Sequence, residues 1–377
     1  MAKLDYNSGY KKNVAKPSHL QPLYPIKKRK RKISFFARIR LAIFCLLLCY
    51  FVFPYSISNL WNSLLINRVH NSAILLNDID FYTHFSDNYI TKNTCLGSVQ
   101  KIAVDADYKP IFTSMYNGGS LSALENRLIS LNTNKSLTPY IFVWDYNTGK
   151  SAKINANKTI ATASIIKLPI LFELFRLVDK GYINLNNEML LEEHYRTGGS
   201  GHLQYQRAGQ KLSISRLAAL MIQDSDNSAT NMLLAKIGGI NSINRVMKQW
   251  GMNNTSLGNW LPDLTGTNVT TPEDMGKLLY NLDNPDLLSL QSRIKVVDIM
   301  SHVKNTSLIQ AGLPDGVSFI HKTGNIGSMI GDAGIVELPN GRKYIVVIMV
   351  KRPHNAFCAK TYIVEASKVI YNYMSSF

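Results

Sequence analysis

Hydrophobic and polar residues recur with a helical period in several stretches between residues 120 and 377. In Leu121–Leu131, leucines return every three or four positions, which places them on one face of a helix. Glycines follow two of the stretches, at Gly181 and at Gly238-Gly239, and glycine readily adopts the conformation that ends a helix. The pattern predicts helices over Leu121–Leu131, Ser164–Asp179, Ile214–Ile222, Ala229–Ile237, Met275–Leu282 and Thr361–Met374.

Short runs with a strand pattern flank this helical part on both sides. The first pair is Tyr140–Tyr146 and Ser151–Asn155, which the turn residues Asn147-Thr-Gly149 join into a hairpin. Near the C-terminus, glycines and Asn340-Gly341 separate the predicted strands Phe319–Lys322, Asp332–Leu338 and Tyr344–Val350. Strands at both ends with helices between them predict an α+β fold, an α/β sandwich whose antiparallel sheet joins the two ends of the domain.

Residues 41–57, LAIFCLLLCYFVFPYSI, carry no charge and are just long enough to cross a bilayer. Residues 1–40 contain twelve Lys and Arg against one acid, and they hold +11 of the total net charge of +17. Positive charge marks the cytoplasmic side of a span, so we expect a cytoplasmic tail, one transmembrane helix, and everything after about residue 58 outside. A cleaved signal peptide is the alternative, since Ser56-Ile-Ser58 suits a peptidase.

The chain therefore divides into a basic tail at 1–40, a transmembrane helix at 41–57, a stalk or small pre-domain at 58–119 and a main domain at 120–377. Because the basicity lies mostly in the tail, we expect no nucleic-acid partner. Cys95 and Cys358 lie outside the predicted span and could pair in an oxidising compartment. No cysteine spacing is typical of a zinc site, so we expect no metal and no cofactor.

A lysine in the apolar run after Ser164 is the first sign of chemistry. Serine needs a base to become a nucleophile, and Lys167 can serve if its pKa is lowered by burial or by a nearby cation. At a helix start, the two side chains share one face and backbone N–H groups point at the serine. The pattern S-x-x-K is not specific, however, because it recurs at Ser8/Lys11, Ser292/Lys295 and Ser301/Lys304.

Two further motifs distinguish Ser164 from these other serines. Ser225-Asp-Asn227 lies between two predicted helices, and Lys322-Thr-Gly324 ends a predicted strand. The earlier Ser86-Asp-Asn88 precedes Ser164 and has no helical context. S-x-x-K, S-D-N and K-T-G in this order are typical of class A β-lactamases and penicillin-binding proteins, and residues 120–377 resemble that superfamily.

The resemblance extends to Gly198-Gly-Ser-Gly201 before the S-D-N motif and to Asp332–Val336 in the last strands. The intervals of 61 residues from Ser164 to Ser225 and 97 from Ser225 to Lys322 are also near those of the family, the second somewhat short. It implies a β-lactamase/transpeptidase-like sandwich with an all-helical subdomain. Together with the predicted span and its basic flank, it indicates a single-pass bacterial inner-membrane protein whose catalytic domain is periplasmic or extracellular.

The resemblance implies acylation at Ser164, with Lys167 taking or relaying the proton and Ser225 passing a proton to the leaving nitrogen. The resemblance also implies a catalytic role for Lys322, in addition to Ser164, Lys167 and Ser225. The substrate-binding residues that it implies are Asn227, Thr323, Gly324 and Asn325. Asn227 would hold the amide side chain of the substrate, Lys322 and Thr323 its carboxylate, and the N–H groups of Ser164 and Asn325 the oxyanion. Asp226 and His321 are expected to be structural.

One position breaks the class A pattern. Those enzymes carry a glutamate on a loop of the Trp-Glu-Pro-Glu-Leu type, which activates the water that releases the acyl group. Here the segment reads Trp260-Leu261-Pro262-Asp263-Leu264, and Leu261 cannot accept a proton. Three alternatives remain open for the missing base: Asp263, either of Glu273 and Asp274, or a Lys167 carboxylated by carbon dioxide.

Three functions are compatible with these residues, and we expect the first, with the other two as alternatives. The first is a membrane-anchored serine hydrolase that hydrolyses β-lactams or related acyl-D-amino acid substrates. The second is a penicillin-binding-protein-like D,D-peptidase or transpeptidase of peptidoglycan, because a long-lived acyl-enzyme suits transfer to an amine. The third is a sensor that is acylated once and signals through its span. The expected partners are a small-molecule or peptidoglycan-derived acyl substrate and, through one helix, a membrane.

Overall fold

The computed structural model describes residues 112–376. The predicted tail, the predicted span and residues 58–111 of the predicted stalk lie outside this part of the chain. Within residues 112–376, no helix combines the length and the apolar character needed to cross a membrane.

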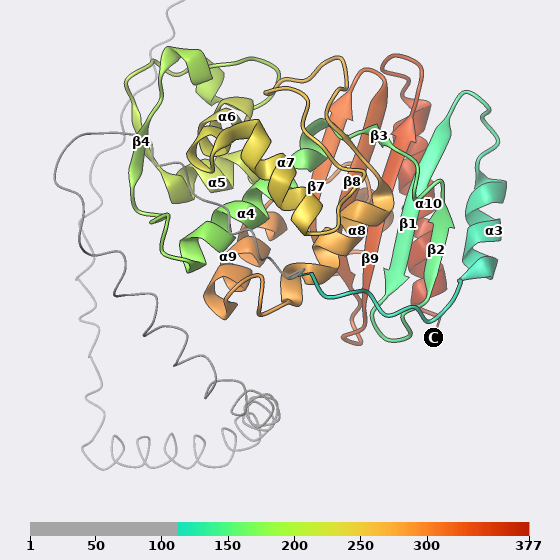
Figure 1. Ribbon diagram of the computed structural model, residues 1–377. Coiled ribbons are helices and arrows are strands. Elements are labelled where there is room, and N and C mark those ends of the chain that lie inside the picture. The colour runs from blue at the N-terminus through green and yellow to red at the C-terminus, as the bar shows by residue number, and fades with distance from the viewer. Residues whose placement is uncertain (1–111, 377) are drawn as a thin grey trace, which may run out of the picture. The chain divides into compact units, whose positions relative to one another are not determined.

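A five-stranded antiparallel sheet forms the centre of the domain, with the strand order β2-β1-β9-β8-β7 (Figure 1). Strand β1 pairs along its whole length with β9, from Thr138 opposite Lys351 to Asp145 opposite Tyr344. The prediction that the sheet joins the two ends of the domain is therefore confirmed. The strands are β1 (Thr138–Asp145), β2 (Ser151–Ile154), β7 (Ser318–Ile326), β8 (Met329–Glu337) and β9 (Lys343–Lys351).

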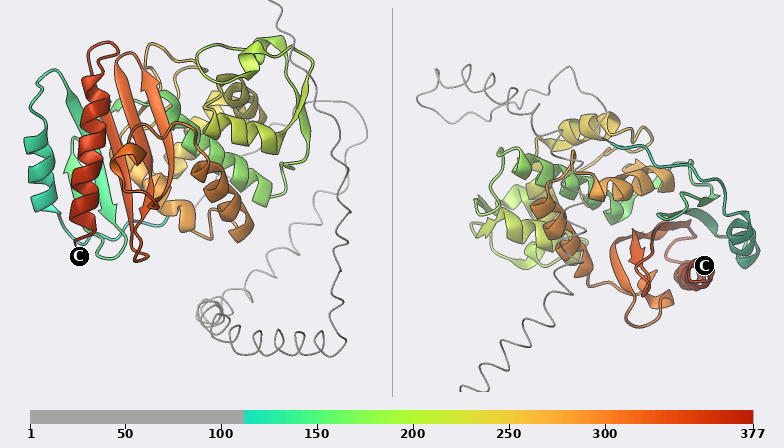
Figure 2. Two further views of the ribbon diagram at one scale, coloured as in Figure 1. Left: turned by 180° about the vertical axis from the view of Figure 1, so that it is seen from behind. Right: turned by 90° about the horizontal axis from the view of Figure 1, so that it is seen from below.

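Helices cover both faces of this sheet. On one face lie α3 (Ser122–Leu131) and the C-terminal helix α10 (Cys358–Met374), which pack against each other. On the other face lies α8 (Pro272–Tyr280), which contacts β1 and β9 (Figure 2). Thr271 caps α8 by accepting a hydrogen bond from the N–H of Asp274, so the helix begins at Pro272, three residues before the predicted stretch Met275–Leu282.

The remaining helices form an all-helical region beside α8, arranged around α4 (Figure 1). Ten of the thirteen residues of α4 are buried, which explains why its sequence is apolar on every side. This region contains α4 (Lys167–Asp179), α5 (Ile214–Gln223), α6 (Asn227–Lys236), α7 (Gly239–Gln249) and α9 (Leu290–Ser301). Two short antiparallel pairs complete the fold, β3 (Ile160–Ala161) with β6 (Val269–Thr270) and β4 (Glu188–Leu190) with β5 (Lys211–Ser213).

The structure corrects three details of the sequence prediction. The helix predicted from Ser164 begins as a 3₁₀ turn, η1 (Ala163–Ile166), and becomes α-helical only at Lys167. Gly238-Gly239 closes α6, but Gly238 is also the residue from which α7 starts. Strand β7 continues past Lys322 to Ile326, because its pairing with β8 extends from Ser318 to Ile326.

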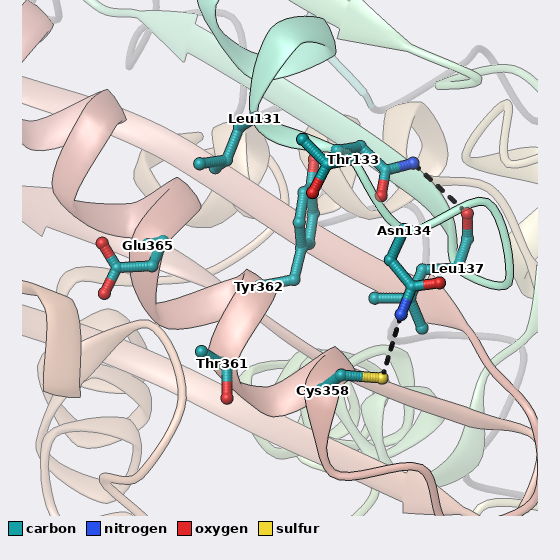
Figure 3. A pocket seen from close by; sticks show the side chains of 9 residues that line it. Leu131, Thr133, Asn134, Leu137, Cys358, Thr361, Tyr362 and Glu365 are labelled. Carbon is teal, nitrogen blue, oxygen red and sulfur yellow. Dashed lines mark hydrogen bonds between the residues drawn. The ribbon is translucent and has the colours of Figure 1, made fainter.

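Cys358 lies at the start of α10, on the α3 side of the sheet. It lines a cavity of about 250 Å³ together with the loop that follows α3 (Figure 3). The Asn134 side-chain amide donates to Cys358 Sγ at 3.5 Å. Cys95 lies outside the described residues, so the pairing of the two cysteines stays a prediction.

Candidate active site

Ser164 lies in the 3₁₀ turn η1 and Lys167 is the first residue of α4. In a 3₁₀ turn, side chains three positions apart lie one above the other, so the S-x-x-K spacing places the two side chains on the same face. Ala163, just before the serine, has φ of +44°, a left-handed conformation that is uncommon for alanine. Strained backbone of this kind often accompanies a functional side chain.

Lys167 is fully buried, and its amine is held by the loop that contains Ser225. Lys167 Nζ donates to Ser225 O at 2.6 Å, to Asn227 Oδ1 at 2.9 Å and to Ser225 Oγ at 3.2 Å. Within residues 112–376, the Ser164 hydroxyl makes no hydrogen bond, and catalytic contacts of this kind often tighten only when substrate binds. The amine therefore contacts Ser225 directly, whereas Ser164 lies three positions earlier in the chain, one turn away.

The pKa of Lys167 is well below the ordinary value for lysine. Burial is the main cause, the positive charge of Lys322 lowers the pKa further, and the negative charge of Asp226 partly offsets both. A lowered pKa leaves an amine neutral in part of the molecules near neutral pH, and only a neutral amine accepts a proton. Lys167 thus has the lowered pKa that a base for Ser164 needs.

The S-D-N motif forms the junction between α5 and α6, and Asp226 is its structural centre. Asp226 caps α6 by accepting from the N–H of Ala229 at 2.8 Å, and it accepts from the N–H of Leu203 at 2.8 Å. Asn227 Nδ2 donates to Gly198 O at 2.9 Å. Asp226 therefore orients the loop, as expected, and Ser225 adopts a left-handed backbone with φ of +55°.

The glycines of the segment Gly198–Gly201 allow the close approach that these contacts need. A Cβ on Gly199 would lie 2.8 Å from Asn227 Nδ2, and one on Gly201 would lie 2.2 Å from Asp226 Oδ2. Gly199 and Gly201 also have φ of +96° and +92°, which other residues rarely adopt. The segment is glycine-rich because it packs directly against the S-D-N motif.

The K-T-G motif lies in β7, and its strand passes directly against the turn that carries Ser164. A Cβ on Gly324 would lie 2.9 Å from Thr162 O and 3.0 Å from Ile165 Cγ1, so only glycine fits there. Lys322 is fully buried and donates to Thr323 O at 2.8 Å. Burial lowers the pKa of Lys322 to about 7, although the negative charge of Asp332 acts in the opposite direction.

These elements enclose a cavity of about 320 Å³, which Ser164, Ser225, Lys322, Thr323 and Asn325 line. Lys167, Asn227 and Gly324 do not line the cavity themselves: the Lys167 amine contacts both Ser225 and Asn227, and Gly324 packs against the turn that carries Ser164. All eight residues named from the sequence therefore come together, although they arise from three separate parts of the chain.

Sequence reasoning did not identify the rest of the cavity wall, Ser200, Gln223, Asp224 and residues 303–305. Asp224 accepts an ion-pair hydrogen bond from Lys304. Asp224 could have been suspected because it precedes Ser225. Lys304 belongs to the S-x-x-K pattern at Ser301. This pattern follows the S-D-N motif in the chain, so it was excluded as the nucleophile motif, and nothing else in the sequence pointed to Lys304.

Arg352, at the end of β9, supports the neighbouring strand end. It donates to Asn325 Oδ1 at 2.5 Å and to Ile326 O at 3.1 Å. These bonds hold the segment whose backbone follows the K-T-G motif. Arg352 carries no motif and therefore gave no signal in the sequence.

His321 is buried on the same strand. It forms a 2.8 Å hydrogen bond with Asp332, and its ring stacks on Phe319 with the centroids 4.4 Å apart. His321 does not line the cavity. The geometry agrees with the structural role that was expected for this residue.

The loop around Leu261 keeps a defined backbone although it lacks the glutamate. Leu261 N donates to Asn231 Oδ1 at 3.0 Å, and Asn231 Nδ2 donates to Leu261 O at 2.7 Å. The bond between Leu261 and Pro262 is cis. Leu261 is 7% exposed, so an apolar side chain is packed at this position.

The carboxylates considered as substitutes for the glutamate are all engaged elsewhere. Asp263 accepts from Asn268 N at 2.6 Å and from the hydroxyls of Thr265 and Thr267. Burial alone would raise the pKa of Asp263, but these hydrogen bonds lower it below its ordinary value. Such a carboxylate fastens the loop and is a poor proton acceptor.

Glu273 and Asp274 occupy the first turn of α8. Glu273 forms a 3.2 Å ion pair with Lys153, and neither residue lines the cavity. Asp274 is buried and accepts from Asn254 N at 2.9 Å and from Lys277 Nζ at 3.2 Å. Both residues therefore act at the start of the helix.

Comparisons with known proteins agree with this geometry. A family model described as the β-lactamase enzyme family matches residues 122–374. The ROB-1 β-lactamase of Haemophilus influenzae is 25% identical over 256 residues, which are 66% of this chain and 83% of that protein. A β-lactamase of Streptomyces albus G is 24% identical over 271 residues, which are 68% of this chain and 86% of that protein.

Among solved structures, PBP-A is 33% identical with a TM-score of 0.68, and the match covers 70% of this chain and 100% of PBP-A. A leucine-to-glutamate variant of PBP-A, solved as an acyl-enzyme complex with penicillin G, matches with the same values.

Proposed function

The chain belongs to the β-lactamase enzyme family, and from this premise we propose that it is a serine hydrolase whose Ser164 is acylated by β-lactams or related acyl-D-amino acid substrates. One observation carries the proposal: Ser164, Ser225 and Lys322 line a single cavity, and Ser225 contacts the buried amine of Lys167. PBP-A, which has been solved with penicillin G bound covalently in one variant, supports the same interpretation.

Acylation follows from the positions of these groups. The neutral amine of Lys167 takes the proton of the Ser164 hydroxyl as Oγ attacks the acyl carbon. The N–H groups of Ser164 and Asn325 stabilise the oxyanion. The C–N bond then breaks, and the leaving nitrogen receives a proton from Ser225 Oγ, which Lys167 Nζ replenishes across 3.2 Å.

Substrate binding uses the other residues of the cavity. Lys322 and Thr323 bind the substrate carboxylate, because a cation beside a hydroxyl suits an anion. Asn227 holds the amide side chain of the acyl group. For this, Asn227 Oδ1 gives up the hydrogen bond that it accepts from the Lys167 amine and accepts one from the substrate amide instead. Gly324 lets the strand approach the Ser164 turn closely enough for both sets of contacts.

Deacylation is the slow step in this proposal. Leu261 supplies no base, and Asp263, Glu273 and Asp274 are engaged elsewhere. A positioned general base accelerates a step by about 10²–10⁴-fold, so its loss lengthens the lifetime of the acyl-enzyme by that order. A long-lived acyl-enzyme favours transfer to an amine, and we therefore place a penicillin-binding-type peptidase or transpeptidase ahead of a fast β-lactamase.

Fast β-lactam hydrolysis is the second candidate, and the β-lactamase relatives favour it. A single experiment separates the two. The full chain is incubated with labelled benzylpenicillin, and the intact mass and the labelled peptide are followed over time, with Ser164→Ala as control. An adduct that persists supports the peptidase, rapid release of penicilloate supports the β-lactamase, and the absence of both an adduct on Ser164 and penicilloate contradicts both.

We further propose that residues 41–57 anchor the protein in the bacterial inner membrane, with the tail in the cytoplasm and the catalytic domain outside. The uncharged run and the basic residues before it carry this proposal. Alkaline phosphatase fused to the C-terminus should be active in cells. An inactive fusion that is nevertheless expressed at full length would contradict the orientation.

A further inference from the structure

An ion pair closes the cavity wall beside Ser225. Asp224 accepts from Lys304 Nζ, and the backbone N–H of Lys304 donates to Gln223 O at 3.1 Å. The side chain of Asp224 is 7% exposed, whereas that of Lys304 is 66% exposed. The backbone of Lys304 is therefore fixed against the Ser225 loop, while its ammonium group remains accessible.

The charges that line the cavity make this lysine important for an anion. Asp224, Lys304 and Lys322 are the ionisable residues of the cavity lining. If Lys304 were absent, the carboxylate of Asp224 would face an anionic substrate without a partner and would repel it. Lys322 alone is an incomplete anchor, because its pKa of about 7 leaves part of the molecules uncharged at neutral pH.

We propose that Lys304 determines specificity by contacting the substrate carboxylate together with Lys322, and that Asp224 holds its ammonium group at the cavity until substrate binds. A lysine suits this exchange, because a compact charge on a flexible stem can leave one carboxylate for another. The inference rests on the proposed acylation of Ser164 and extends it from the reacting serine to the recognition of a free carboxylate.

The test compares two probes that differ only in the carboxylate, benzylpenicillin and its methyl ester. The second-order rate constant for acylation of Ser164 is measured for the full wild-type chain and for Lys304→Gln. We expect the substitution to slow acylation by benzylpenicillin about two- to fivefold, as for a largely exposed ion pair, and to leave the ester unchanged. Lys304→Arg retains a cation and should keep most of the preference for the acid.

A double variant, Asp224→Asn with Lys304→Gln, separates contact from simple charge balance. It has the same net charge in the cavity lining as the wild type, since one anion and one cation are removed together. If Lys304 contacts the substrate, the double variant stays slow with benzylpenicillin. Lys368→Gln is the matched control, because Lys368 forms an exposed ion pair with Glu365 in α10, on the other side of the sheet.

The outcomes distinguish this inference from the proposed function. Absence of both an adduct on Ser164 and penicilloate release in the wild type overturns the proposed function and the inference together. If the wild type is labelled, equal slowing of both probes by Lys304→Gln overturns the inference alone, and so does recovery of the rate in the double variant. Thermal unfolding of each variant shows that the rates refer to folded protein.

Discussion

Replacing Leu261 by glutamate tests whether a missing base limits release of the acyl group. The backbone of Leu261 is held on both sides by the Asn231 side chain, at 3.0 Å and 2.7 Å. Neither hydrogen bond involves the leucine side chain. The Leu261→Glu loop should therefore keep its backbone position and present a carboxylate where the leucine now packs.

The size of the effect depends on the role of the base. A positioned general base contributes about 10²–10⁴-fold, which at about 1.36 kcal/mol per factor of ten lowers the barrier to deacylation by about 3–5 kcal/mol. The variant also loses the burial of a leucine side chain, worth about 1.5–3 kcal/mol. We therefore expect faster release together with a lower melting temperature, and an acylation rate of the same order as in the wild type.

The assay follows the acyl-enzyme formed with benzylpenicillin by mass spectrometry after free drug is removed. Leu261→Gln is the matched control, because glutamine has the shape of glutamate and does not act as a base. The lifetime should shorten about 10²–10⁴-fold in the glutamate variant and change little in the glutamine variant. Equal lifetimes in the two variants would refute the reasoning.

Three further variants test how the site is built. Lys322→Met removes a cation that lowers the pKa of Lys167, so the rise of acylation rate with pH should move to higher pH. A penicillin methyl ester is the probe, because it offers Lys322 no carboxylate, and an unmoved profile contradicts the coupling. Gly324→Ala places a Cβ 2.9 Å from Thr162 O, so the Ser164 turn must shift. Acylation by labelled penicillin should fall about 10²-fold, and unchanged labelling would exclude this effect. Asn231→Ala leaves the buried N–H and C=O of Leu261 unpaired, which should lower the free energy of unfolding by about 1–3 kcal/mol for each group. Urea unfolding measures this loss, and Asn231→Asp, which keeps the acceptor for the Leu261 N–H, is the control and should lose less.

The sequence predicted those strands and helices whose pattern of apolar and polar residues is visible within the segment itself. The run Tyr344–Val350 is apolar throughout because β9 is paired on both sides and covered on both faces. The end of β7 could not be predicted in the same way. Residues 323–326 are polar or small apart from Ile326, and they are extended because β8 pairs with them.

Helix α7 escaped prediction for a different reason. Its buried residues Ile243, Val246 and Met247 follow helical spacing, but the paired glycines before them are typical of the end of a helix. Gly238 has φ of +96°, which suits a chain reversal between two helices equally well. A glycine pair marks a boundary in the sequence, and the boundary alone does not distinguish a loop from the start of a second helix.

The residues of the candidate site also fall into those that a local motif identifies and those that only the fold brings together. Ser164, Ser225 and Lys322 were identified because each lies in a motif whose order along the chain is informative. Lys304 lies 80 residues from Asp224 in the sequence, and only the fold brings the two together. The motif residues could therefore be predicted, whereas the wall that completes the cavity could not.

The loop at Leu261 shows that the position of a catalytic residue and its chemistry are stabilised separately. Asn231 holds the backbone of Leu261, and Asp263 fastens the following turn through Asn268. None of these contacts depends on the side chain at position 261, so exchanging glutamate for leucine there need not disturb the fold. Under the proposed function, one architecture can thus either release or retain an acyl group, depending on the side chain at this position of the loop.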